Sequence, residues 1–146
     1  MSFRKRNDQT LLPTDYSDKT ITVVFVYKTD VEDDMDQQEL LSCALSYISE
    51  NEEYDVICYR NDMWFGVTSK CLACIYIGFD QEDFQSASDA LRLVDTKKWK
   101  LNVGFMMLEN VYTKIIITAM APPESLFTSS KKWQDKVKKF KVVKVN

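Results

Sequence analysis

The 146-residue chain is predicted to form one α+β domain, a two-layer sandwich in which a mainly antiparallel sheet carries two helices on one face. The length suits a single domain, and 45% hydrophobic with 28% charged residues is typical of a globular protein. Apolar and amphipathic stretches follow one another in the order β-α-β-β-β-α-β-β before a basic C-terminal segment. We expect a polar arm over residues 1–19, the α+β domain over 20–121, and a basic segment over 122–146 that packs on or extends the domain.

The individual elements are predicted from the spacing of apolar residues. Strands are expected where β-branched and aromatic residues run almost without interruption, as in ITVVFVY (21–27) and CLACIYIGF (71–79). Helices are expected where apolar residues recur three or four positions apart, behind the capping residues Asp36 and Asp80. A hairpin turn is expected at Asn61-Asp62. The predicted strands cover 21–27, 54–60, 63–68, 71–79, 101–108 and 113–120, the helices cover 36–50, 80–94 and 125–139, and residues 140–145 form a last strand or a tail.

The charges are sorted along the chain. Residues 30–62 contain eleven acidic residues against one base, whereas residues 131–146 contain seven lysines against one acid. The formal net charge of −3 hides both segments. Because complementary charge steers encounter and like charge penalises wrong approaches, this separation favours oriented docking to another macromolecule.

The composition argues against most enzyme classes. The chain has no histidine, which removes the commonest acid/base catalyst and metal ligand, and three glycines are too few for a Gly-rich phosphate loop. The acidic run that begins at Asp30 lacks the glycine and the terminal glutamate of a calcium-binding loop. We therefore predict a non-enzymatic protein without a cofactor or metal. An enzyme with a carboxylate- or cysteine-based site in a cleft is the alternative left open.

The four cysteines are expected to be reduced and buried. Cys71 and Cys74 form a C-x2-C pair, but residues three apart in a strand point to opposite faces, which does not suit one metal ion.

No apolar run approaches the ~20 residues needed to cross a bilayer, and the basic N-terminus lacks the apolar core of a signal peptide. We expect an intracellular protein, cytoplasmic or nuclear, with no membrane partner.

Two groups of residues are candidate contacts. The basic end combines lysines with a tryptophan, a pattern that can hold phosphates of RNA or an acidic partner while a ring stacks on a base. Apolar residues on the sheet face away from the helices, together with the acidic segment, are expected to contact a protein partner. The predicted RNA or acidic-partner contacts are Lys131, Lys132, Trp133, Lys136, Lys138, Lys139 and Lys141, and the predicted protein contacts are Trp64, Met106, Asp33 and Asp34.

The stretch CLACIYIGFDQEDFQSASDAL, residues 71–91, resembles the strand-to-helix passage of the small α/β protein subunits of ribonuclease P and ribonuclease MRP. The strand and helix before it and the strand pair after it extend the resemblance over about residues 20–119. The resemblance implies a non-catalytic subunit that binds a sister protein and supports a catalytic RNA. The acidic segment 30–62 and Leu108-Glu-Asn-Val depart from that group, and both departures weaken the case for RNA contact by the sheet.

The leading prediction is a non-catalytic interaction subunit of a larger intracellular assembly such as a ribonucleoprotein. It is expected to bind another protein subunit and to contact RNA through its basic termini. The alternative is a stand-alone effector or inhibitor, for example of viral origin, that masks a host protein through the acidic segment.

Overall fold

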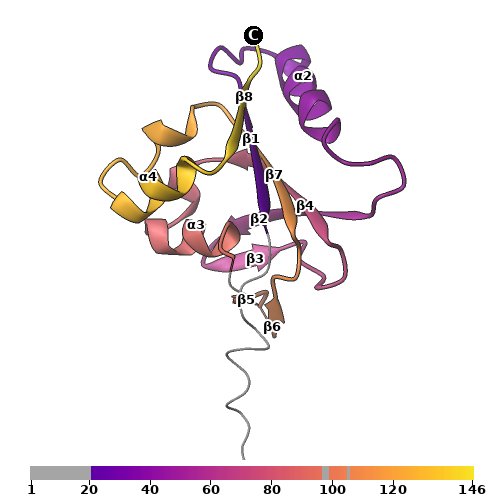
Figure 1. Ribbon diagram of the computed structural model, residues 1–146, viewed down its shortest axis with the longest axis vertical. Coiled ribbons are helices and arrows are strands. Elements are labelled where there is room, and N and C mark those ends of the chain that lie inside the picture. Colours follow the sequence, from indigo (N-terminus) through magenta and orange to yellow (C-terminus); the bar gives the residue numbers. More distant parts are fainter. Residues whose placement is uncertain (1–20, 97–98, 105) are drawn as a thin grey trace, which may run out of the picture.

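A six-stranded sheet with the strand order β3-β2-β4-β7-β1-β8 forms the centre of the fold (Figure 1). The structure is a computed structural model and describes residues 21–96, 99–104 and 106–146. The predicted arm over 1–19 lies outside these residues. The strands are β1 (Thr22–Tyr27), β2 (Tyr54–Arg60), β3 (Met63–Phe65), β4 (Ala73–Phe79), β5 (Lys100–Asn102), β6 (Met107–Glu109), β7 (Lys114–Ala119) and β8 (Lys141–Lys144). The α-helices are α2 (Asp34–Leu45), α3 (Ala87–Leu93) and α4 (Lys131–Val137), and the 3₁₀ helices are η1 (Gln81–Asp83) and η2 (Pro123–Ser125).

The sheet is mainly parallel, so the predicted mainly antiparallel sheet is wrong, although the broader prediction of a mixed α and β fold is confirmed. β1 pairs in parallel with β7 and β8, and β4 pairs in parallel with β2 and β7. Among the described strands, β3 alone joins this sheet antiparallel, in a hairpin with β2. The physical reason is visible in β1 and β7, whose consecutive side chains are almost all buried, because parallel sheets are normally covered on both faces.

The helices lie on both faces of the sheet, not on one as predicted. α2 packs Leu40 and Ala44 against a small core that includes Val24 and Ile116. Residues that alternate with these on the strands, such as Phe25, point into a larger core with α3 and α4. Figure 1 shows α2 on one side of the strands and α3 with α4 on the other. The architecture is therefore three-layered.

Aromatic rings dominate the larger core. The Phe79 ring stacks on Trp133 at a centroid distance of 5.7 Å and meets Phe84 at 5.1 Å. The hydroxyl of Tyr76 donates to Asp83 Oδ2 (2.9 Å) and accepts from the backbone N–H of Tyr59 (3.2 Å). Through these contacts β4, η1 and α4 pack against one another.

Residues 122–146 are part of the sheet and of the larger core. They supply η2, α4 and β8, and β8 is an edge strand beside β1. Trp133 on α4 is fully buried, and its indole N–H donates to the carbonyl of Pro123 (2.9 Å). The basic end is thus held by apolar contacts on one side of α4.

Several local predictions are confirmed. Asn61 (φ 52°) and Asp62 (φ 62°) form the turn between β2 and β3, and positive φ at both positions is typical of a type I′ turn. Asp80 and Asp83 form the expected capping box, but around η1. The cap of α2 is Asp33, whose side chain accepts from the backbone N–H of Asp36, whereas the sequence had suggested Asp36.

Among the described residues, no helix combines the length and apolar character needed to cross a membrane.

Candidate interaction surfaces

Two of the predicted contact residues are core residues. Trp64 is 4% exposed and packs against Tyr59 and Phe84, and Trp133 is 0% exposed. The predicted roles of Trp64 at a protein interface and of Trp133 as a stacking platform required exposed rings. The structure places both rings inside the larger core, which corrects those two predictions.

Met106, Asp33 and Asp34 are exposed. Met106 and its neighbour Met107 lie by the short β5–β6 ribbon, with exposed fractions of 57% and 54%. Asp33 and Asp34 lie at the start of α2, where Asp33 also caps the helix. The structure therefore does not bring these predicted protein contacts together at one place.

The predicted lysine contacts separate into three sets. Lys131 and Lys138 both pair with Asp135, at 2.9 and 3.8 Å. Lys141 is on β8 with its ammonium 5.0 Å from the centroid of the Tyr47 ring, and Lys139 is exposed. Lys132 and Lys136, four residues apart on α4, line a groove.

This groove, here called the α3–α4 groove, has a volume of about 430 Å³. Its basic residues are Arg92, Lys132 and Lys136, and its acidic residue is Asp95. The guanidinium of Arg92 lies 5.0 Å from the centroid of the Trp99 ring, in cation–π contact. The residues that line the groove are Ser88, Leu91, Arg92, Asp95, Trp99, Lys132 and Lys136.

The orientation of Trp99 is fixed by hydrogen bonds. Its indole N–H donates to Asp95 Oδ2 (2.7 Å), and its backbone N–H donates to the side-chain oxygen of Asn110 (2.7 Å). Asn110 is fully buried and also donates from its amide to the carbonyl of Arg92 (3.1 Å). One buried side chain thus holds Trp99 beside the end of α3. The sequence did not reveal that these residues meet, because Arg92 and Trp99 are 33 to 44 residues away from Lys132 and Lys136 in the chain.

The second surface is an exposed apolar area on the α2 side of the sheet, here called the open sheet face. It consists of Tyr54 and Val56 on β2, Phe65 on β3 and Ile77 on β4, with exposed fractions of 39–52%. Val56 lies beside Ile75, which α2 covers, and Phe65 lies opposite Cys58, two residues after Val56. Alternation along the strands therefore places all four side chains on the same face as α2.

The open sheet face exists because α2 packs over the centre of the sheet and leaves β2 and β3 uncovered on that side. Its contacts with the sheet centre on β1 and β7, and its buried side chains reach only as far as Ile75 on β4. Parallel strands are normally covered on both faces, so an uncovered β2 in such a sheet is unusual. An exposed apolar area of this kind marks an interface more often than a random surface does.

Acidic residues lie beside one end of the open sheet face. Glu50, Glu52 and Glu53 belong to the connection that leads from α2 to Tyr54 at the start of β2. Lys114 fastens this connection: its ammonium donates to Glu52 Oε1 (2.7 Å), and this hydrogen bond is the main reason that the pKa of Glu52 is lowered. Arg60, at the end of β2, is the one base of the acidic segment.

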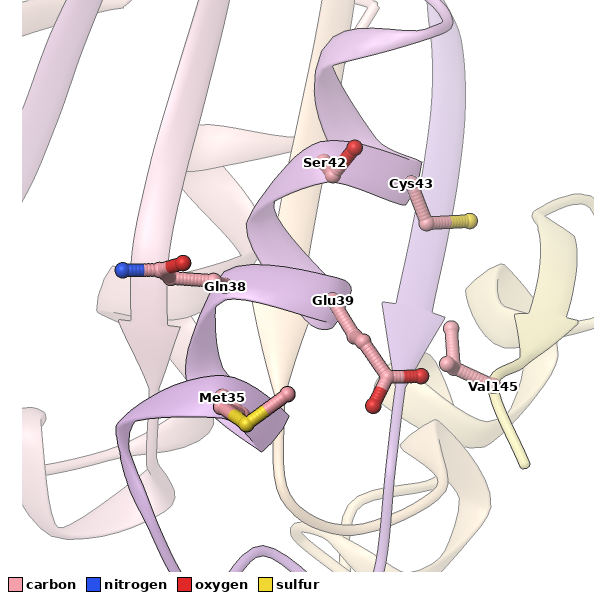
Figure 2. Close-up of a pocket in the computed structure, with 6 residues that line it drawn as sticks. All are labelled: Met35, Gln38, Glu39, Ser42, Cys43 and Val145. Carbon is pink, nitrogen blue, oxygen red and sulfur yellow. The ribbon is translucent and has the colours of Figure 1, made fainter.

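The hollow between α2 and the C-terminal end offers little chemistry. Its volume is about 540 Å³, and Figure 2 shows its lining side chains along α2, with Val145 opposite. The ionisable groups in its lining are Glu39 and Cys43. A carboxylate and a thiol without a paired base do not make an acid/base or nucleophilic site.

Cys71 and Cys74 do not have the environment of a nucleophile. Partial burial, followed by the nearby Asp55 carboxylate, raises the pKa of the Cys71 thiol, which disfavours the reactive thiolate. Cys74 is buried in the larger core. Within residues 21–96, 99–104 and 106–146, no three Cys, Asp or Glu side chains gather as metal ligands would.

The carboxyl edge of a doubly wound sheet is the usual place for a small ligand. Here that edge has cavities of about 200 Å³ beside Lys28 and about 130 Å³ beside Gly78. Lys28 is 8% exposed, and its ammonium lies 3.9 Å from Asp36 Oδ1. Both cavities are below the size of typical ligand pockets, so this edge is a weaker candidate than the two surfaces above.

No protein-family model matches the chain, and the comparison with curated proteins finds no match.

Proposed function

We propose that this protein is a non-catalytic interaction subunit of a larger assembly, and that the open sheet face binds its protein partner. The observation that carries the proposal is the exposure of Val56, Phe65 and Ile77 on one uncovered area of a parallel sheet. A partner that covers this area would give β2 and β4 the second layer that such strands normally have.

The partner is expected to present an apolar surface bordered by basic residues. Burial of the apolar side chains would supply the association free energy, at about 25 cal/mol per Å² of apolar area before the costs of association. The glutamates beside the start of β2 would favour a partner with positive charge at that end of the contact. The acidic segment thus adds orientation to a contact that is apolar at its centre.

The first prediction compares Val56→Glu with Val142→Glu. Both valines are exposed strand residues, at 52% and 43%, but Val142 lies on the edge strand β8. The test uses wild-type protein and both variants as baits in nuclease-treated extract of the source organism. One protein is expected to bind wild type and V142E, and its purified form is expected to bind V56E at least about tenfold more weakly.

Three results would count against the proposal. The first is equal binding of the purified partner to V56E and V142E. The second is a partner without basic residues at the contact. The third is a wild-type dimer that V56E converts to monomer, because a second copy of the chain would then cover the open sheet face.

Membership of a ribonucleoprotein stays part of this proposal. It is supported by the separation of charge along the chain and by the exposed lysines Lys131, Lys138 and Lys139. Purification with and without nuclease tests it, because an assembly held by RNA would lose components after nuclease treatment. The effector alternative is favoured if one partner remains bound at one-to-one stoichiometry after nuclease treatment and is released by charge reversal at Asp34.

A further inference from the structure

The α3–α4 groove contains two lysines that form no ion pair with another described residue. By contrast, Lys131 on the same helix and Lys138 at its C-cap share Asp135. Arg92 is in contact with the Trp99 ring. Of the described residues, three cations and one carboxylate therefore line a space of about 430 Å³. Such a concentration of positive charge in one groove suits an anionic ligand.

The groove is built to hold an anion in a defined position. Trp99 is fixed by Asp95 and Asn110, and its ring in turn supports the guanidinium of Arg92. A guanidinium lying against a ring keeps its N–H edge available for a bidentate contact with a phosphate. Lys132 and Lys136 supply two further donors from α4.

We propose that the α3–α4 groove binds a phosphorylated serine, threonine or tyrosine side chain of a partner protein. This inference goes beyond the proposed function and uses a different surface from the open sheet face. A phosphorylated side chain carries a charge of about −1.5 to −2 on one group, which matches three cations gathered at one place. Leu91 and Ser88 in the lining offer apolar and hydroxyl contacts to the peptide that carries the phosphate.

A nucleic-acid strand fits the groove less well. A strand distributes single charges along its length and binds best to an extended basic track with free aromatic faces. Here Arg92 occupies one face of the Trp99 ring, so that face is not free to stack on a base. The geometry therefore favours a single, highly charged phosphate on a peptide.

The test uses peptide pools with a central phosphoserine, phosphothreonine or phosphotyrosine between random residues. The same pools without phosphate and a single-stranded oligouridine are the comparison ligands. Binding is followed by NMR of the tryptophan indole N–H signals. Trp99 is 37% exposed and lines the groove, whereas Trp64 and Trp133 are buried, so a phosphopeptide is expected to shift the Trp99 signal alone.

The matched variants are K132Q/K136Q and K131Q/K138Q, which remove the same charge from α4 and its C-cap. We expect K132Q/K136Q to weaken phosphopeptide binding at least about tenfold and K131Q/K138Q to change it less than about twofold. Thermal unfolding of both variants checks that each is folded. Failure of every phosphorylated pool to bind wild type overturns the inference. So do equal binding of the unphosphorylated pools, tighter binding of oligouridine, and equal weakening by the two variants. Each of these results leaves the proposed role of the open sheet face intact.

Discussion

At the residue scale, a buried polar side chain determines where an exposed aromatic side chain lies. Asn110 is fully buried, and its amide links the backbone of Trp99 to the end of α3. A buried amide is costly to leave without hydrogen bonds, so this side chain defines one position for Trp99. The sequence showed Asn110 only as one residue in a short polar connection, because its partners are set by the tertiary fold.

Gly66 offers the sharpest test at this scale. Its φ is +88°, and a Cβ at this position would lie 2.0 Å from the carbonyl oxygen of Val56. Gly66→Ala is therefore expected to lower the free energy of unfolding by about 3 kcal/mol or more, through contact with backbone and strain at positive φ. Urea unfolding measures the effect.

Gly78→Ala is the control for that experiment. Gly78 also has a positive φ, +77°, but a Cβ there would meet nothing within 4 Å. Its substitution is expected to cost about 1 kcal/mol, from backbone strain alone. If both variants lose the same free energy of unfolding, the close approach of the chain after β3 to β2 is not what requires glycine at position 66.

At the scale of elements, local pattern and long-range pairing differ in what the sequence reveals. The positions of β1, β2 and β4 follow directly from their apolar residues and were predicted within two residues. Their partners were not, because strand order depends on contacts between distant segments, as in the pairing of β1 with β7 and β8. One signal was available: near-continuous apolar runs are typical of parallel strands, and two such strands in one chain favour helices on both faces.

The candidate surfaces were predictable only in part. The sequence identified lysines at the C-terminal end, but not that Lys132 and Lys136 would face Arg92 and Trp99. It also assigned the exposed face of the sheet to Trp64, whereas Val56 is exposed and Trp64 is buried. Which face of a strand is covered depends on where the helices pack, and apolar alternation alone does not decide this.

Asp33 caps α2, so its contribution to stability can be measured separately from its predicted role as a contact for a protein partner. Asp33 Oδ1 accepts the backbone N–H of Asp36 at 2.9 Å, so Asp33→Ala is expected to lower the free energy of unfolding by about 1 kcal/mol. Asp33→Asn keeps an oxygen acceptor and is expected to change it by only a few tenths of a kcal/mol. Chemical denaturation of the two variants measures the difference. If both variants lose the same stability, the charge of Asp33 and not its capping bond stabilises α2.

At the scale of the whole molecule, the basic groove and the exposed apolar area lie on different faces. The open sheet face is on the α2 side, whereas the α3–α4 groove lies among the helices of the opposite layer. A three-layer architecture allows this arrangement, because each face of the sheet has its own helices. Two partners could therefore bind without competing for the same surface.

The larger core also makes the whole fold sensitive to alkaline pH. Burial raises the pKa of Tyr59, Tyr76 and Tyr112 above the ordinary value of 10.0, and for Tyr76 the nearby Asp83 adds to the effect. Because the folded state holds these protons more tightly, the unfolded state alone loses them as the pH rises above about 10. The stability they confer is complete below that pH and is lost progressively above it.

We therefore expect the free energy of unfolding to fall as the pH rises above about 10, and the buried tyrosines to ionise only as the fold is lost. Ultraviolet absorbance reports tyrosinate, and near-ultraviolet circular dichroism reports the packed core. Tyr76→Phe is expected to lower stability at neutral pH by about 1–3 kcal/mol, since the N–H of Tyr59 loses its acceptor, and to reduce the alkaline slope. Tyr54→Phe, at an exposed position of β2, is the matched control and is expected to leave that slope unchanged. Ionisation of all seven tyrosines while the circular dichroism signal stays intact would contradict the packing of these three side chains.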